Sequence, residues 1–338
     1  MGWVKVLRRP ALPNLLARTT RAQSPPPAAL VWARLGVVYV IWGSTYFAIR
    51  EAILTLPPLL MAAFRFLVAG GLLYAWAVRR GDRTADRPRP QHWLAAFAIG
   101  TSLLLVGNGG VVLAERSVPT GVVALIIATV PLWMALIDRV LFGQRLAPRA
   151  IGGLALGFGG LALLVGSPGG GHFRAVDLVI ALVAPIGWSI GSMYSRRAPL
   201  PQRALVATAM EMICGGCALG VAGLLHGELA DVHPERFSVA SLLGLAYLVV
   251  FGSWIAFSSY IWLLKVAPVS LVSTYAYVNP VVAVFLGWAF LSERIGARTV
   301  IAAAIIVAAV ALIVSARKLP PGDPADAAPD AARLDRDA

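Results

Sequence analysis

Charged residues are scarce in this chain. Asp, Glu, Lys and Arg make up 13% of its 338 residues, roughly half the share found in an ordinary soluble domain, while hydrophobic residues make up 59%. A net charge of +13 would suggest a nucleic-acid partner for a soluble protein. With so little charge overall and a mean hydropathy of +0.77, we instead expect a polytopic membrane protein whose basic residues lie in its loops.

Cysteine, histidine and catalytic motifs are equally scarce. The two cysteines, Cys214 and Cys217, lie in one apolar segment without neighbouring ligands. Because metal sites need three or four ligands, we interpret the cysteines as small residues at a helix contact. All four histidines lie in loops or at the ends of apolar segments, and no G-x-x-x-x-G-K-[ST], H-E-x-x-H or G-x-S-x-G motif occurs. These absences argue against an intramembrane enzyme, a bound nucleotide, a metal and any other cofactor.

Long apolar runs fill most of the chain. A run of about 18 apolar residues or more is typical of a membrane-spanning helix. We expect ten such helices, near residues 32–49, 57–78, 93–113, 118–137, 148–166, 176–195, 204–225, 239–262, 268–290 and 298–315. Before them lies a basic arm at residues 1–31, disordered and cytoplasmic unless it is an over-extended start. After them lies an Ala/Asp/Pro-rich tail at 316–338, also expected to be disordered.

Lys and Arg are unevenly distributed over the loops. With the N-terminus inside, the inner segments hold 21 of them and the outer loops six, while Arg34 and Arg65 lie within spans. Cytoplasmic loops of membrane proteins are enriched in Lys and Arg. We therefore expect both termini in the cytoplasm.

The second half of the chain repeats the first. A shift of 149 residues aligns Pro131 with Pro280, and a shift of 146 residues aligns Trp42 with Trp188. Each half has five expected spans, and this odd number makes the two halves antiparallel in the membrane. Such inverted repeats are typical of secondary transporters.

The prolines of spans four and nine are the central feature of the repeat. Pro280 follows Asn279 in the middle of an apolar run, and Pro131 is its equivalent. A proline inside a helix frees a backbone carbonyl, and in lipid that group must be satisfied within the protein. We therefore expect both helices to be broken there and to line a cavity.

Several motifs resemble the EamA domains of the drug/metabolite transporter superfamily. They are Ile41-Trp42-Gly43-Ser44-Thr45-Tyr46-Phe47, Pro57-Pro58 with Arg65-Phe66, Gly107-Asn108-Gly109, Ala128-Thr129-Val130-Pro131 and the stretch from Tyr275 to Val284. The resemblance covers about residues 32–316, as two EamA repeats at 32–166 and 176–315. It implies a ten-helix carrier in the bacterial inner membrane that exports small metabolites or drugs, and it leaves the substrate open.

Two ionisable residues lie in the middle of spans. Arg65 in span two and Glu211 in span seven are the same position in the 146-residue register. A charge inside the bilayer costs roughly 3 kcal/mol or more, so such residues are functional candidates. Their depths would allow the two side chains to meet. Three interpretations stay open: a structural pair or a protonated Glu211, proton coupling through Glu211, and contact of either residue with substrate.

Aromatic and polar residues form a second candidate group for substrate contact. They are Trp42, Ser44, Tyr46, Asn108, Thr129, Trp188, Ser192, Trp254, Ser258, Tyr275, Tyr277 and Asn279, with Pro131 and Pro280 beside them. Rings with polar edges at membrane depth suit flat, amphipathic or cationic organic solutes. For each single ring, packing is the alternative.

Together these features predict an all-α membrane protein that exports small organic molecules by alternating access and is coupled to protons. A passive facilitator of the same fold, in which Glu211 is structural, is the alternative. Broken helices near the centre favour a carrier over a channel. The expected partners are a small organic solute, lipid and protons; the sequence leaves the oligomeric state open.

Reporter fusions test the expected topology. A reporter fused after Lys318 should be active in the cytoplasm, and one inserted in residues 226–238 should be active in the periplasm, because the Lys and Arg bias fixes the orientation. Phosphatase and fluorescent-protein fusions measure the two outcomes. A C-terminus outside the cytoplasm would contradict the ten-span topology.

Overall fold

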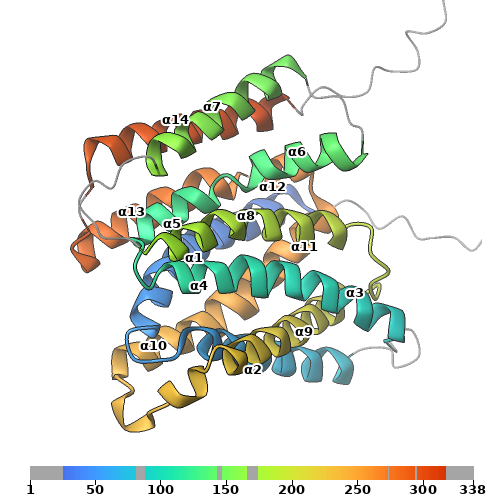
Figure 1. Ribbon diagram of the computed structural model, residues 1–338. Coiled ribbons are helices and arrows are strands. Elements are labelled where there is room, and N and C mark those ends of the chain that lie inside the picture. The colour runs from blue at the N-terminus through green and yellow to red at the C-terminus, as the bar shows by residue number, and fades with distance from the viewer. Residues whose placement is uncertain are drawn as a thin grey trace, which may run out of the picture.

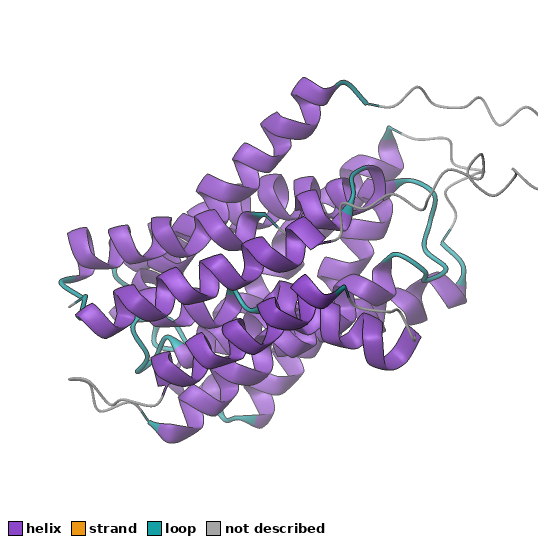
Figure 2. Cartoon of the chain, turned by 90° about the horizontal axis from the view of Figure 1, so that it is seen from above, coloured by secondary structure: helices purple, strands orange, loops and turns teal. Residues whose placement is uncertain are grey.

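The protein is built from helices. The computed structural model describes residues 26–80, 88–142, 147–165, 174–272, 274–293 and 295–316, and no strand occurs in these ranges (Figure 2). The expected arm at 1–31 and tail at 316–338 lie almost entirely outside the described residues. The predicted all-helical class is confirmed for the part that is described.

The helices follow one another in an order that matches the apolar runs of the sequence. They are α1 (Ala28–Ala52), α2 (Pro58–Arg79), α3 (Pro90–Gly100), the π-helix η1 (Thr101–Gly109), α4 (Gly110–Ala114), α5 (Thr120–Ile127), α6 (Val130–Phe142), α7 (Pro148–Val165), α8 (Ala175–Ser195), α9 (Ala204–Leu225), the short 3-10 helices η2 (Glu228–Asp231) and η3 (Pro234–Arg236), α10 (Val239–Tyr247), the π-helix η4 (Leu248–Phe257), α11 (Ser258–Val266), α12 (Val269–Val272), α13 (Tyr275–Leu291) and α14 (Ala297–Ala316).

Seven helical segments are long and apolar enough to cross a membrane. They are Ala28–Ala52, Pro58–Arg79, Pro90–Ala114, Thr120–Ile137, Ala175–Ser195, Ala204–Leu225 and Val239–Val266. Three shorter apolar helices, Pro148–Leu164, Val278–Leu291 and Ala297–Leu312, coincide with the expected fifth, ninth and tenth spans. The described residues therefore form a membrane protein with many spans.

Two pairs of long helices lie at opposite edges of the bundle. α7 packs along α14 at one edge, and α2 packs along α9 at the other (Figure 1). The repeat makes α2 equivalent to α9 and α7 equivalent to α14. Each edge is therefore a pair of equivalent helices, one from each half, as an internal two-fold arrangement requires.

The first helix of each half packs against the other half. α1 contacts α10, η4, α11 and α13, whereas α8 contacts η1, α4, α5 and α6. These two sets of contacts are equivalent under the repeat. The two halves found in the sequence therefore exchange their first helices instead of packing as separate bodies.

Glycines let α2 and α9 approach closely. A Cβ atom on Gly70 would lie 2.7 Å from the Cβ of Met212 and 3.1 Å from Cγ1 of Ile213, and one on Gly216 would lie 2.9 Å from Cγ of Leu67. Gly70 is equivalent to Gly216, and Leu67 to Ile213, in the 146-residue register. The sequence repeat thus corresponds to a repeated contact in space.

The interruptions of spans four and nine differ from the expectation at one point. α5 ends at Ile127 and α6 begins at Val130, so span four is interrupted just before Pro131, as predicted. α13 instead continues through Pro280, and span nine is interrupted before Tyr275, so the expected break at Pro280 is misplaced. Membrane helices tolerate proline where packing and neighbouring polar groups satisfy the backbone.

Two π-helices lie at equivalent places in the third and eighth spans. η1 follows α3, and η4 follows α10. A π-helix is rare and is frequent at functional sites, because it shifts the side chains relative to an α-helix. Nothing in the residue pattern predicted these two segments.

The glycine contacts generate a stability prediction. Gly70→Leu should lower the unfolding temperature by several degrees, because overpacking a filled interface costs about 1–3 kcal/mol. Gly71→Leu is the matched control, since a Cβ at Gly71 meets no atom within 4 Å. Thermal unfolding of the purified protein in detergent measures both; equal unfolding temperatures for the two variants would contradict the close α2–α9 contact.

Candidate functional site

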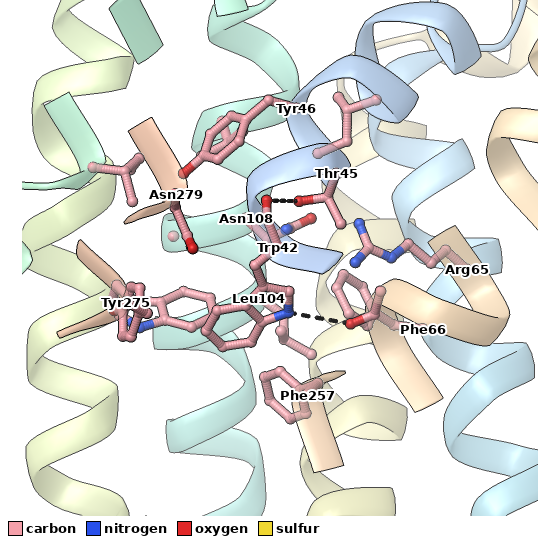
Figure 3. A pocket seen from close by; sticks show the side chains of 16 residues that line it. Trp42, Thr45, Tyr46, Arg65, Phe66, Leu104, Asn108, Phe257, Tyr275 and Asn279 are labelled. Atoms are coloured by element: carbon pink, nitrogen blue, oxygen red, sulfur yellow. Dashed lines mark hydrogen bonds between the residues drawn. The ribbon is translucent and has the colours of Figure 1, made fainter. Parts of the chain in front are cut away.

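A cavity lies in the middle of the bundle, where the two halves meet. Its described lining residues are Trp42, Thr45, Tyr46, Ile49, Arg65, Phe66, Leu104, Gly107, Asn108, Val111 and Ile127 from the first half, and Trp188, Gly252, Phe257, Tyr275 and Asn279 from the second (Figure 3). Its volume is about 60 Å³, which suffices for a few waters. The cavity is therefore small in this conformation.

Trp42 is the centre of an aromatic cluster beside the cavity. Its ring lies 4.8 Å from that of Tyr260, 5.4 Å from Trp188 and 5.5 Å from Tyr275, between centroids. The contacts with Trp188 and Tyr275 are edge-to-face, at 86° and 89°, an arrangement that aromatic pairs favour. Trp42 comes from the first half and its three partners from the second, so the cluster joins the halves.

Arg65 brings a positive charge into this apolar surrounding. Its side chain is 3% exposed, its Nε donates a hydrogen bond to Ser253 Oγ at 2.6 Å, and its guanidinium lies 4.6 Å from the ring of Phe66. Its Nη1 has no hydrogen-bond partner, and neither has Oδ1 of Asn108. Figure 3 shows the guanidinium turned into the cavity. A buried donor and a buried acceptor are thus available for a ligand.

The π-helix η4 holds the two central side chains. The carbonyl of Gly252 accepts a hydrogen bond from Nε1 of Trp42 at 3.3 Å, and the next residue, Ser253, binds Arg65. A Cβ on Gly252 would lie 2.9 Å from Nη2 of Arg65 and 3.1 Å from Cγ2 of Thr45. A larger residue at this position would therefore displace the Arg65 guanidinium from its present place.

Two further cavities lie at the ends of the bundle. The Lys265 vestibule, of about 360 Å³, is lined by Ser195, Arg196, Ala198, Leu200, Pro201, Gln202, Glu211, Ile261, Leu264 and Lys265. The Glu293 vestibule, of about 300 Å³, is lined by Arg50, Glu51, Leu54, Ser117, Val118, Pro119, Leu291 and Glu293. Arg50 and Leu54 are the repeat equivalents of Arg196 and Leu200, so the vestibules are equivalent places. Neither shares a described lining residue with the central cavity.

Glu211 faces the Lys265 vestibule and not the central cavity. It is fully buried, and neither carboxyl oxygen has a hydrogen-bond partner. The charge that influences it comes from Lys265. The expected contact between Arg65 and Glu211 is therefore absent, because Arg65 turns to η4 while Glu211 turns toward α11.

Seven of the predicted residues line the central cavity: Trp42, Tyr46, Arg65, Asn108, Trp188, Tyr275 and Asn279. Oriented to suit its neighbours, the Asn279 amide donates to the carbonyls of Tyr39 and Tyr275. The wall also contains residues that we did not predict: Thr45, Phe66, Gly252 and Phe257, with Tyr260 behind them. Thr45 and Phe66 belong to the motifs that resemble EamA domains, so the sequence contained a signal for them. Gly252 and Phe257 belong to η4, and no sequence pattern indicated this π-helix.

The other predicted residues whose side chains the structure describes do not line the cavity. Ser44 shares a hydrogen bond with Tyr247 at 2.6 Å, Thr129 donates to the Ile126 carbonyl at 2.6 Å, and Ser192 shares one with Tyr260 at 2.9 Å. Pro131, Trp254, Ser258 and Pro280 are also absent from the described lining. Trp254 belongs to the π-helix η4, and Ser258 begins α11. The side chain of Tyr277 lies outside what the structure describes.

Carboxylates close the end of the bundle at the Glu293 vestibule. Glu293 accepts hydrogen bonds from the N–H of Thr120 at 2.7 Å, from its hydroxyl at 2.9 Å, and from the next N–H at 3.3 Å. Glu228 accepts from the N–H groups of Leu59 and Leu60 at 3.1 and 2.9 Å. Helix N-termini favour negative charge. These two residues of the second half therefore bind α5 and α2 of the first.

Apolar helices in two equivalent halves, with a cavity between them and a vestibule at each end, define a membrane transporter. A family comparison identifies which kind. The chain belongs to the EamA-like transporter family, whose model matches residues 29–166 and 177–315. The resemblance seen in the sequence is thereby confirmed.

Similar proteins agree with this assignment. The uncharacterised inner membrane transporter YedA of Escherichia coli (strain K12) is 38% identical over 295 residues, 87% of this chain and 94% of YedA. A WAT1-related chloroplastic protein of Arabidopsis thaliana is 27% identical over 84% of this chain and 69% of its own. PecM of Dickeya dadantii (strain 3937) is 25% identical over 85% of this chain and 95% of its own. A crystal structure at 23% identity covers 87% of this chain and 99% of its own with a TM-score of 0.61, which supports the fold.

The separation of Arg65 from Glu211 generates a prediction. The changes in the free energy of unfolding caused by Arg65→Leu and Glu211→Leu should add in the double variant, because the two side chains share no partner. The coupling energy should therefore lie within about 0.5 kcal/mol of zero. Thermal unfolding of the four proteins measures this coupling. A double variant that recovers the stability lost in the single variants would instead reveal the pair expected from the sequence.

Proposed function

We propose that this protein is a secondary transporter of the bacterial inner membrane, which exports small organic solutes by alternating access through ten spans. The observation that carries the proposal is the small central cavity, lined by both halves and separate from a vestibule at each end. The Lys265 vestibule would face the cytoplasm, because the loops expected there hold most of the Lys and Arg. Both termini would lie on that side.

The central cavity would bind a solute with a flat apolar part and an anionic or strongly accepting group. The rings of Trp42, Trp188 and Tyr275 offer apolar faces, and Nη1 of Arg65 is a donor without a partner. An acceptor that binds Arg65 would compensate a charge whose burial is otherwise unfavourable. A cationic solute, which the aromatic residues alone would also suit, would be repelled by this guanidinium.

Alternating access would arise from the equivalence of the two halves. The repeat relates the Glu293 vestibule to the Lys265 vestibule, so a conformation in which one half adopts the arrangement of the other would interchange the two ends. The solute would enter from the Lys265 vestibule and leave through the Glu293 vestibule. The narrow central cavity would have to widen for each passage.

Glu211 would couple transport to protons. It lies in the Lys265 vestibule with both oxygens unpartnered and faces Lys265. A buried carboxyl beside an aqueous vestibule is suited to releasing a proton there. A facilitator in which Glu211 is structural is the competing function.

Transport by inside-out vesicles tests these roles. The probe is labelled 3-phenylpropionate, competed by its matched amide and by 3-phenylpropylamine. Wild-type protein should take up the carboxylate against its gradient when a pH gradient is imposed, and the amine should compete at least tenfold less well than the unlabelled acid, because of the charge of Arg65. Arg65→Gln should remove uptake, while Glu211→Gln should keep exchange at equal concentrations and lose accumulation.

Arg80→Gln is the matched control for Arg65→Gln. It removes an exposed guanidinium at the end of the same helix, stacked 5.3 Å from the ring of Trp76, and uptake should be unchanged. Stronger competition by the amine would overturn the anionic class of solute. Uphill accumulation by Glu211→Gln at the wild-type rate would remove the coupling role of Glu211.

A further inference from the structure

Glu115 is a buried carboxyl group that the proposed transport function does not use. It follows α4 at the Glu293 end of the bundle, its side chain is 0% exposed, and neither carboxyl oxygen has a hydrogen-bond partner. A buried ionised carboxyl without a partner is very unfavourable. The group must therefore be neutral in this conformation or change its surroundings when it ionises.

Charged and titratable groups of three elements lie near Glu115. Tyr46 and Arg50 of α1 and Glu293 at the end of α13 act on it electrostatically. On α8, the buried Asp177 accepts a hydrogen bond at 2.8 Å from Ser117, two residues after Glu115. Arg50 does not bind the carboxyl: its Nη1 donates to the backbone carbonyls of Glu115 and Arg116. Burial, and then the charge of Glu293, raise the pKa of Glu115 well above its ordinary value, and Arg50 lowers it in part.

Glu293 is held in place by a strained and tightly packed turn. Ser292 has a φ of 55°, a left-handed conformation that ends a helix but is unfavourable for a residue other than glycine. The turn directs the Glu293 carboxylate back over Gly287, where a Cβ would lie 2.5 Å from Oε2. In this position the carboxylate binds the first N–H groups of α5. Span nine and span four are thus joined by one acidic side chain, which we call the Glu293 clasp.

We propose that Glu115 is a proton-binding residue that controls the Glu293 clasp, and through it the closure of this end of the transporter. When Glu115 is neutral, the clasp holds α13 on α5, as seen here. When a carboxyl oxygen of Glu115 gives its proton to water that enters from the Glu293 vestibule, past Arg50 and Ser117 in its lining, a second negative charge is left within electrostatic reach of Glu293. Repulsion between the two carboxylates then releases the clasp, and the vestibule opens toward the central cavity.

The position of Tyr46 connects this switch to the central cavity. Tyr46 lines that cavity, and its hydroxyl group lies within the electrostatic reach of Glu115. A solute in the central cavity and a proton on Glu115 would therefore both influence Tyr46 of α1. An exchange of solute for a proton rests on the proposed export function, whereas closure of the Glu293 end by protonated Glu115 does not.

Cysteine labelling in nanodiscs tests the proposal without any substrate and independently of orientation. Val118 lines the Glu293 vestibule but is 1% exposed, whereas Leu54 on the same vestibule is 60% exposed. In a background without Cys214 and Cys217, the maleimide labelling rate of Val118→Cys is divided by that of Leu54→Cys, which removes the pH dependence of an exposed thiol. The same ratio in the Glu115→Gln background shows the pH dependence that burial gives to the Val118→Cys thiol itself, and it is subtracted. The ratio should rise at least fivefold with pH, because Glu115 ionises, with a midpoint well above the ordinary range of a carboxyl group.

Three variants decide the outcome. Glu115→Gln should keep the ratio low at every pH, because it cannot ionise. Gly287→Ala should keep it high, because its methyl group displaces Glu293. Glu235→Gln, an exposed carboxyl at the same end, should behave as wild type. If Glu115→Gln retains the wild-type pH dependence, the proposal is overturned.

A conservative variant covers the case in which Glu115→Gln does not fold. Glu115→Asp keeps a carboxyl group but shortens the side chain by one methylene, so the midpoint of the labelling ratio should shift. An unchanged midpoint would overturn the proposal. Failure of the transport assay with an intact pH-dependent ratio would count against the export function alone.

Discussion

Backbone polar groups inside a bilayer have no water to bind, and this constraint governs the centre of the protein. Spans that depart from regular α-helix need partners from elsewhere, and the two halves supply them to each other. Trp42 binds a carbonyl of η4, Ser102 binds the carbonyl of Gly187 at 2.7 Å, and Ser189 binds the carbonyl of Val130 at 3.2 Å. Each bond crosses from one half to the other. The π-helices therefore take part in the interface between the halves: η4 accepts one of these bonds at Gly252, and η1 donates another from Ser102.

Charge is distributed along the bundle in a way that fits this arrangement. The centre holds one guanidinium among aromatic rings, and acidic side chains bind helix starts at the Glu293 end. At the other end, Arg203 donates to the carbonyl of Ala77 at 2.9 Å, near the end of α2. Cations favour helix C-termini as anions favour N-termini. Backbone groups at helix ends otherwise lack hydrogen-bond partners, and charged side chains supply these partners at both ends of the transporter.

The sequence predicted the parts of this structure that depend on composition and period. Apolar runs located the helices, the matching prolines and tryptophans revealed the repeat, and the motifs around Trp42 and Asn279 identified residues of the central cavity. The prediction from sequence failed where the local type of helix, α or π, decides the direction of a side chain. Arg65 and Glu211 occupy equivalent positions in the repeat, and their expected depths in the membrane would allow contact. Arg65 instead binds Ser253 of η4, so the two side chains do not meet. Glu115 was missed because, one residue beyond a span, its position alone gives no sign of burial.

The exchange of first helices has a consequence for how the chain is made. α1 precedes the other described helices in the chain, but most of its packing partners, namely α10, η4, α11 and α13, belong to the last third of the chain. During synthesis α1 must therefore wait in lipid with its aromatic and polar face unpartnered, whereas α8 finds η1, α4 and α6 already inserted. One repeat alone would leave most contacts of its first span unmade, and an oppositely inserted copy would have to supply them. Fusion of two repeats in one polypeptide makes that meeting intramolecular, at a ratio and orientation fixed by translation.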